Sequence, residues 1–146
     1  MKKMYVMVAL PRAGKSTYIN NHFQGVIRVS ADQLRLLIHG KRFWDQGEAK
    51  VWWVRDIMIK ALMEQGLDIV IDQTNTTRPR RKYLLELAAR YGYQALAIVI
   101  TTDKELCKER AVSTNQEDLI PVIEKMAENY EKVNKEEGFY EIIHVE

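Results

Sequence analysis

The sequence contains few of the residues that mark disulfide-bonded, zinc-binding or membrane proteins. Its 146 residues include one cysteine and three histidines, so an internal disulfide framework is excluded and no zinc-ligand spacing occurs. No apolar run approaches the roughly 20 residues that a membrane-spanning helix requires. The apolar start, YVMVAL, is too short for a secretory signal peptide. We therefore expect a cytoplasmic protein with no membrane partner.

Excess charge of one sign is also scarce, and so are proline and low-complexity segments. The net charge is +2, with 47% hydrophobic and 29% charged residues and three prolines. This composition is typical of a soluble globular protein, and the length fits one domain at roughly 150 residues per domain. We expect a single domain over residues 1–146. The small positive charge permits a local basic cleft, and nothing indicates an obligate protein partner.

Short apolar runs alternate with helical patterns along the whole chain. Strands are predicted over residues 4–9, 26–29, 68–72, 94–101 and 141–145, and helices over 15–23, 30–40, 48–66, 79–91, 103–111 and 119–134. This alternation indicates an α/β protein with a central parallel sheet of about five strands and helices on both faces. In such three-layer folds ligands bind beyond the carboxyl ends of the strands.

A phosphate-binding loop, ALPRAGKST, follows the first predicted strand and opens a helix. Free backbone N–H groups and the helix dipole suit a phosphate at this position. Lys15 would neutralise the β- and γ-phosphates of ATP or another nucleoside triphosphate, and the Ser16 hydroxyl would bind Mg²⁺. The predicted nucleotide site comprises Ala9, Pro11, Arg12, Ala13, Gly14, Lys15, Ser16 and Thr17.

Two residues of this loop depart from the usual pattern. Ala9 stands where a glycine is usual, which is tolerable only if its φ is negative. Arg12 stands where small residues often occur. Its side chain is either solvated or a cation that lies over the γ-phosphate or the acceptor.

Two carboxylates follow the next two predicted strands. Asp32 lies in the first turn of a helix and would take the proton of an attacking hydroxyl; its alternative role is to stabilise the helix dipole. Asp72 ends a buried strand and would reach Mg²⁺ through water; its alternative is to form a turn. Arg35 would clamp an acceptor phosphate, or pair with Asp32 on the helix surface.

A polar turn, QTNTTRPRR, follows Asp72. Thr74 and Asn75 are expected near the point of phosphoryl transfer. Arg78 belongs to a basic cluster at the next helix start, where cations oppose the dipole. A contact between Arg78 and the acceptor is therefore expected, with a solvated helix start as the alternative.

Four segments in order, ALPRAGKST, SADQLR, DQTNTTRPRR and EEGFYEIIHV, resemble the small P-loop phosphotransferases grouped with phage polynucleotide 5′-hydroxyl kinase. The resemblance implies the P-loop kinase fold, with Lys15 and Ser16 on ATP and Mg²⁺. It also implies Asp32 as the general base and Arg35 on the acceptor phosphate. The phosphatase partner that is fused to some members of this family has no room in the chain.

The same resemblance implies a lid around residues 111–118 with two arginines that touch the nucleotide. Arg110 matches the first, but Thr114 stands at the second, and the segment VSTNQED contains no cation. Because an arginine at the transferring phosphoryl group can be worth several powers of ten in rate, either the enzyme is slow or another arginine fills this role. Arg12 is the favoured substitute.

The predicted activity is ATP-dependent phosphorylation of a hydroxyl, with the 5′-hydroxyl of a polynucleotide as the leading acceptor. Trp44, Trp52, Trp53 and Tyr83 are candidates to stack a base, although neighbours on a helix face different ways and either Trp52 or Trp53 is expected in the core. Two alternatives remain open. One is a kinase for a nucleoside, modified base or other small molecule, and the other is a non-catalytic nucleotide-binding module.

Overall fold

A five-stranded, all-parallel sheet forms the centre of the computed structural model, which describes residues 1–146. Its strands are β1 (Lys3–Val8), β2 (Ile27–Ser30), β3 (Ile69–Asp72), β4 (Gln94–Ile100) and β5 (Glu141–Val145). They lie in the order β2-β3-β1-β4-β5, and every neighbouring pair is parallel. The strand β1 is central because the chain crosses to β2 and β3 on one side and then to β4 and β5 on the other. The predicted parallel sheet of about five strands is confirmed.

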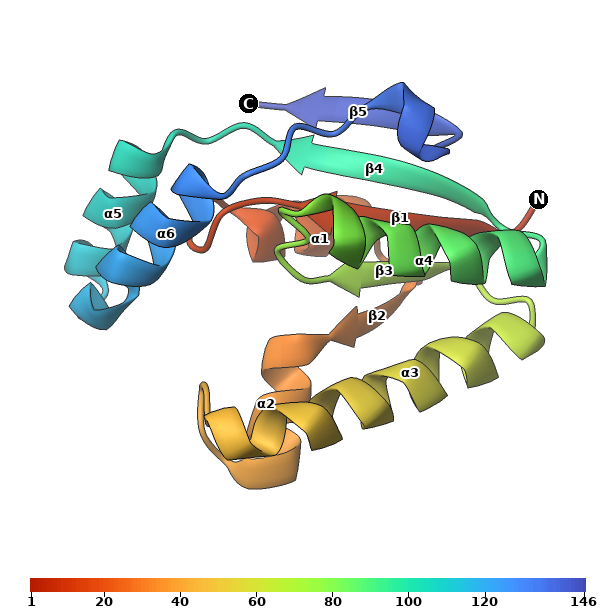
Figure 1. Ribbon diagram of the computed structural model, residues 1–146, viewed down its shortest axis with the longest axis horizontal. Coiled ribbons are helices and arrows are strands. Elements are labelled where there is room, and N and C mark those ends of the chain that lie inside the picture. The colour runs from red at the N-terminus through yellow and green to blue at the C-terminus, as the bar shows by residue number, and fades with distance from the viewer.

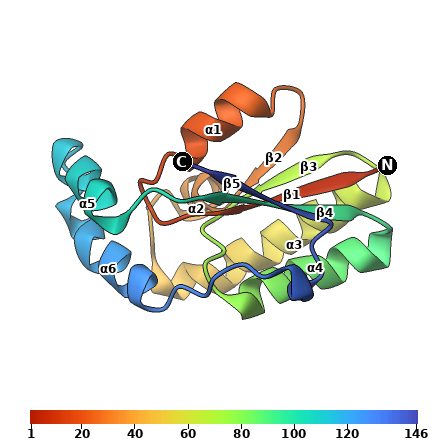
Figure 2. The ribbon, with the colours of Figure 1, turned by 90° about the horizontal axis from the view of Figure 1, so that it is seen from above.

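Helices cover both faces of this sheet. They are α1 (Lys15–His22), α2 (Ala31–His39), α3 (Glu48–Glu64), α4 (Arg78–Tyr91), α5 (Lys104–Ser113) and α6 (Ile120–Glu128), with short 3₁₀ turns at Asp45–Gly47, Glu117–Leu119 and Lys135–Glu137. Figure 2 shows α1 on one face and α3 with α4 on the other. In Figure 1 the pair α5 and α6 lies beyond the carboxyl ends of the strands. No helix is long and apolar enough to cross a membrane.

The alternation of side chains along β1 divides the core into two halves. Met4, Val6 and Val8 pack with buried residues of α3 and α4, whereas Met7 packs on the other face with α1, α5 and α6. All four are fully buried, and burial of side chains of this size stabilises the fold by about 1.5–3 kcal/mol each. Cys107, the one cysteine of the chain, is buried in the second half of the core.

The hydrogen bonds at the helix ends explain where the helices begin and end relative to the predicted ranges. Ser30 caps α2 by accepting from the Gln33 N–H at 3.2 Å. The cap of α5 is Asp103, whose carboxylate accepts from two backbone N–H groups of the first turn. The hydroxyl of Thr102 donates to the carbonyl of Ala13 at 2.8 Å and so supports the loop after β1. The last helix ends at Glu128, earlier than predicted.

Candidate active site

One large cleft lies at the carboxyl ends of the strands, with a volume of about 1940 Å³. It is bounded by the loop after β1, the first turn of α2, the start of α3, the turn after β3, and the helices α5 and α6. Pockets for a single small ligand are usually about 300–1,000 Å³. The cleft therefore has room for a nucleotide and a second substrate together.

The loop between β1 and α1 has the conformation of a phosphate-binding loop. Gly14 has φ 104° and precedes α1 without any side-chain cap, so the first N–H groups of the helix remain free for an anion. Ala9 has a negative φ, because the residues with positive φ are Arg12, Asn75, Asn115 and six glycines. Its N–H donates to the carbonyl of Thr74 at 3.0 Å. The condition that the sequence placed on Ala9 is met.

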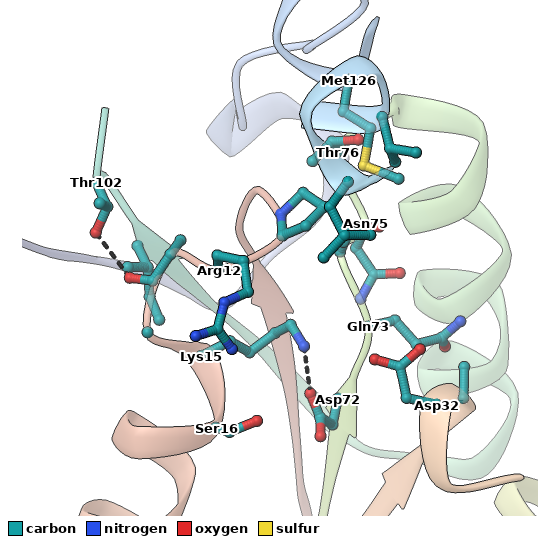
Figure 3. Close-up of a pocket in the computed structure, with 18 of the residues that line it drawn as sticks. Arg12, Lys15, Ser16, Asp32, Asp72, Gln73, Asn75, Thr76, Thr102 and Met126 are labelled. Atoms are coloured by element: carbon teal, nitrogen blue, oxygen red, sulfur yellow. Dashed lines mark hydrogen bonds and ion pairs between the residues drawn. The ribbon is translucent and has the colours of Figure 1, made fainter. Parts of the chain in front are cut away.

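Arg12 occupies a left-handed backbone position with φ 67°. A residue with a Cβ there costs about 1–2 kcal/mol that glycine avoids, so the backbone alone would favour glycine at this position. Nη1 of Arg110 donates to the carbonyl of Arg12 at 3.1 Å and braces the loop. Both guanidinium groups line the cleft, and in Figure 3 the side chains of Arg12 and Lys15 extend into the same space.

Asp72 is the buried centre of a cation cluster below the loop. Its Oδ1 accepts from Lys15 Nζ at 2.7 Å, and its Oδ2 accepts from Arg28 Nε at 2.8 Å. Arg28 Nη2 also donates to the Ser16 hydroxyl at 3.1 Å. Burial would raise the pKa of Asp72, but Lys15 and Arg28 together outweigh that effect and hold the pKa below its usual value.

The residues predicted to bind Mg²⁺ fit a divalent cation. The Ser16 hydroxyl and the Asp72 carboxylate both contact the single guanidinium of Arg28, so one cation reaches both oxygens. These are the hard oxygen ligands that Mg²⁺ prefers, with water and phosphates completing the shell. No group of three or more His, Cys, Asp or Glu side chains gathers anywhere in the structure. Arg28 was not among the predicted site residues, and its only signal in the sequence is a cation inside the apolar strand VIRVS.

Asp32 lies in the first turn of α2, across the cleft from the loop (Figure 3). Its side chain is 78% exposed and accepts from Arg35 Nη1 at 2.7 Å. Arg35 turns its other two donors to the carboxylate of Glu48, at 2.9 and 2.7 Å. The hydrogen bond to Glu48 is the main reason that the pKa of Arg35 is raised. The two predicted residues do meet in the cleft, but Glu48, which the sequence analysis did not include, occupies the phosphate-binding fork of Arg35.

Trp52 forms the aromatic wall of the same end of the cleft. Its ring is approached by the guanidiniums of Arg55 at 4.5 Å, Arg80 at 5.0 Å and Arg35 at 5.7 Å, within the range of cation–π attraction. Trp53 points to solvent with 66% of its surface exposed. The expectation that one of these two tryptophans fills the core is therefore wrong. Neither Trp44 nor Tyr83 lines the cleft.

The two predicted substrate residues in the turn after β3, Thr74 and Asn75, differ in how far they are exposed. Thr74 lines the cleft. Asn75 also lines the cleft, but it is only 1% exposed, and its side-chain amide donates to the carbonyl of Met7 at 2.9 Å and so holds the turn to β1.

The three arginines at the start of α4, Arg78, Arg80 and Arg81, have different surroundings. Arg78 lies outside the cleft and lines a separate cavity with Glu131 and Glu137. Arg81 is fully buried and pairs with Glu137 at 2.8 Å. Arg80 alone of the three lines the cleft, because residues two apart on a helix point about 200° apart. The position of Arg78 therefore does not fit the predicted contact with the acceptor, and Arg80 is the arginine of this cluster that reaches the cleft.

The segment predicted as a lid, residues 111–118, comprises the last turn of α5 and the start of a 3₁₀ turn. It supplies an anion rather than a cation, since Asp118 pairs with Arg42 of the α2–α3 connection. Lys125 of α6 lines the cleft as well. The cations that line the cleft here without a carboxylate partner are Arg12, Arg110 and Lys125. Lys125 was not among the predicted site residues.

A family model described as an AAA domain matches residues 4–133. The chain belongs to this AAA-domain family. No curated protein matches the sequence. Among solved structures, a chain of the Pnkp1/Rnl/Hen1 RNA repair complex is similar at a TM-score of 0.70 and 16% identity, over 89% of this chain and 46% of that one. This AAA-domain chain thus spans less than half the length of that relative.

Two small-molecule kinases are similar over almost the whole chain. The Mycobacterium tuberculosis APS kinase CysC has a TM-score of 0.66 at 14% identity, over 98% of this chain and 88% of that one. Shikimate kinase from Acinetobacter baumannii has a TM-score of 0.62 at 14% identity, over 100% and 84%. At these identities the likeness shows the fold, which is the P-loop kinase fold that the sequence predicts. The AAA-domain chain is a P-loop kinase-like domain.

Proposed function

We propose that the protein is an ATP-dependent kinase that transfers the γ-phosphate to a hydroxyl, and that its acceptor is the 5′-hydroxyl of a polynucleotide. One observation carries the proposal. The exposed carboxylate of Asp32 faces the Lys15 side of a phosphate-binding loop across a single cleft. A nucleotide hydrolase would need only the loop and a positioned water, whereas a carboxylate opposite the loop suits an acceptor hydroxyl.

The residues around the loop divide the chemistry between them. The free N–H groups at the start of α1 and the ammonium of Lys15 hold the β- and γ-phosphates, and Lys15 exchanges its contact with Asp72 for the phosphates. Ser16 and Asp72 would hold Mg²⁺, which would supply neutralisation of the phosphate charge. Asp32 accepts the proton of the attacking hydroxyl. The hydroxyl oxygen bonds to the γ-phosphorus while the bond to the bridging oxygen breaks, and ADP leaves.

The acceptor end of the cleft supports a polynucleotide. Trp52 and Phe43 present aromatic faces there, and Arg80 adds a cation beside Trp52. A base stacked on an aromatic side chain contributes about 1–3 kcal/mol, whatever its sequence. The similarity to a chain of an RNA repair complex points in the same direction.

Phosphorylation of a small hydroxyl compound is the second candidate, and Glu48 favours it. With its Nε and Nη2 on Glu48 and its Nη1 on Asp32, each of the three nitrogens of Arg35 already donates to a carboxylate in this arrangement. A neutral acceptor without a phosphate would leave these contacts in place. A polynucleotide would have to draw Arg35 away from Glu48.

The two candidates separate in one experiment with ATP, Mg²⁺ and a panel of acceptors, read out by acceptor mass. The panel comprises 5′-hydroxyl RNA and DNA, the same oligonucleotides with 5′-phosphate, and nucleosides, sugars and polyols. We expect a gain of one phosphate on the 5′-hydroxyl oligonucleotides alone, absent with Asp32→Asn. Phosphate on small acceptors alone would overturn the polynucleotide proposal. Tight ATP binding with no transfer to any hydroxyl would overturn the kinase proposal itself.

A further inference from the structure

Arg28 is a cation built into the place where the proposed function needs a metal. Its side chain extends from β2 and contacts Asp72 through two donors at 2.7–2.8 Å. A third contact, to the Ser16 hydroxyl, is 3.1 Å long. The guanidinium therefore bridges the two oxygens that would hold Mg²⁺.

The cluster also carries more positive than negative charge. Asp72 supplies one negative charge, while Lys15 and Arg28 supply two positive charges at contact distance. A divalent cation placed on the same oxygens would meet both of these cations. Such repulsion is strong in a partly buried site, where the effective dielectric constant is about 20 rather than 80. The metal can share Asp72 and Ser16 only if Arg28 gives up at least one of them.

The side chain of Arg28 has room to move away from Asp72 and Ser16 toward solvent. Its side chain is 30% exposed, whereas that of Asp72 is 3% exposed, so the guanidinium lies at the open edge of the cluster. Nη1 already donates to the Asn20 amide oxygen on α1 at 3.2 Å. The position of Arg28 on a strand fixes its backbone, and its flexible side chain allows it to turn outward toward Asn20 and solvent.

We propose that Arg28 is a counter-cation that competes with the divalent metal for Ser16 and Asp72. It holds both residues in place before the substrate arrives, and it opposes metal binding until the negative charge of the nucleotide phosphates attracts the metal and offsets the repulsion. Arg28 is thus a positioning residue that makes metal entry depend on the nucleotide. The inference rests on the proposed nucleotide site but does not depend on which hydroxyl is phosphorylated.

The test measures metal binding directly, without turnover. Mn²⁺ is titrated into the protein and free Mn²⁺ is followed by electron paramagnetic resonance, first alone and then with a non-hydrolysable ATP analogue. In Arg28→Gln we expect Mn²⁺ alone to bind about tenfold tighter than in the unaltered protein, because a contacting positive charge is gone. The gain should be smaller with the nucleotide present. Arg90→Gln, which removes an exposed arginine from α4, controls for net charge.

Two further variants keep the test decisive if Arg28→Gln folds poorly, which thermal unfolding would reveal. Asn20→Ala removes the outer contact of Arg28 and leaves Ser16 and Asp72 untouched, so it should weaken Mn²⁺ binding two- to threefold. Arg28→Lys retains the charge and should stay within twofold of the unaltered protein.

Several outcomes would overturn the inference. Unchanged or weaker Mn²⁺ affinity in Arg28→Gln would do so, and so would a lack of Mn²⁺ binding in every variant. Binding of the ATP analogue in the presence of a chelator is measured in parallel. Failure of the unaltered protein to bind the ATP analogue would count against the proposed function. Normal analogue binding, together with an Mn²⁺ affinity in Arg28→Gln equal to that of the unaltered protein, would count against the role of Arg28 alone.

Discussion

The two ends of the cleft are built in different ways. At the donor end, Lys15, Asp72 and Arg28 are locked to one another, and the central carboxylate is 3% exposed. At the acceptor end, Asp32 is 78% exposed, and Arg35 is held mainly by Glu48. The donor end is therefore a fixed network of buried and partly buried charges, and the acceptor end is a more open surface with one exposed carboxylate, that of Asp32.

This difference separates stability from chemistry. A buried ion pair whose partner is removed leaves an uncompensated charge, so changes at the donor end should cost folding free energy. An exposed carboxylate such as that of Asp32 can be neutralised at little cost in stability. Changes at the acceptor end should therefore alter turnover or substrate affinity and leave folding nearly untouched.

The largest effect is expected at Arg12, which tests whether the donor end holds a catalytic cation. Arg12→Gly should lower kcat by about 10³-fold or more if this arginine stabilises the transferring phosphoryl group, with ATP affinity changed far less. The glycine also relieves the φ 67° backbone, so unfolding should cost about 1 kcal/mol more than in Arg12→Ala. Steady-state kinetics and denaturant unfolding measure both. Turnover equal to that of the unaltered protein would show that Arg12 is only a solvated side chain.

Neutralisation of Asp32 is the next largest effect. Asp32→Asn should lower kcat by about 10²–10⁴-fold through loss of the general base. Its free energy of unfolding should stay within about 0.5 kcal/mol, because the side chain is 78% exposed. Nucleotide affinity, measured by calorimetry, should not change. A large loss of stability with normal turnover would instead give Asp32 a structural role.

Asp72→Asn should show the opposite pattern, with a stability loss of about 2 kcal/mol. The estimate lies below the range for a fully buried pair because Arg28 is partly exposed. The pKa of Asp72 is lowered in the folded state. The stability from this carboxylate is therefore complete above the unfolded pKa of about 3.9 and is lost as the pH falls through the lower folded value.

Urea unfolding between pH 5 and pH 2 measures how the stability contributed by Asp72 depends on pH. Part of the stability lost on acidification should be missing in Asp72→Asn and retained in Glu86→Gln, which alters an exposed carboxylate on α4. Identical pH profiles for Asp72→Asn and the unaltered protein would contradict the assignment.

Features set by a local sequence pattern could be predicted, whereas contacts between residues far apart in the chain could not. The sheet, the helices and the loop were predictable because each follows from a short local pattern, such as an apolar strand that runs into Gly14 and Lys15. Asp32 was found through its position after a strand. Glu48 and Arg28 were missed because their roles depend on contacts 13 and 44 residues away along the chain. Arg78 was chosen over Arg80 because the sequence alone does not show which side of α4 faces the cleft.

Trp52 gives the smallest of the expected effects and probes the acceptor end alone. Trp52→Ala should raise KM for a 5′-hydroxyl oligonucleotide by about 5- to 100-fold, the equivalent of one stacked base. KM for ATP should be unchanged. Trp53→Ala is the matched control, since Trp53 adjoins Trp52 in α3 but faces solvent. Equal effects of both substitutions would mean that Trp52 acts through the helix or the three arginines around it, and stacking would then be rejected as the means of acceptor recognition.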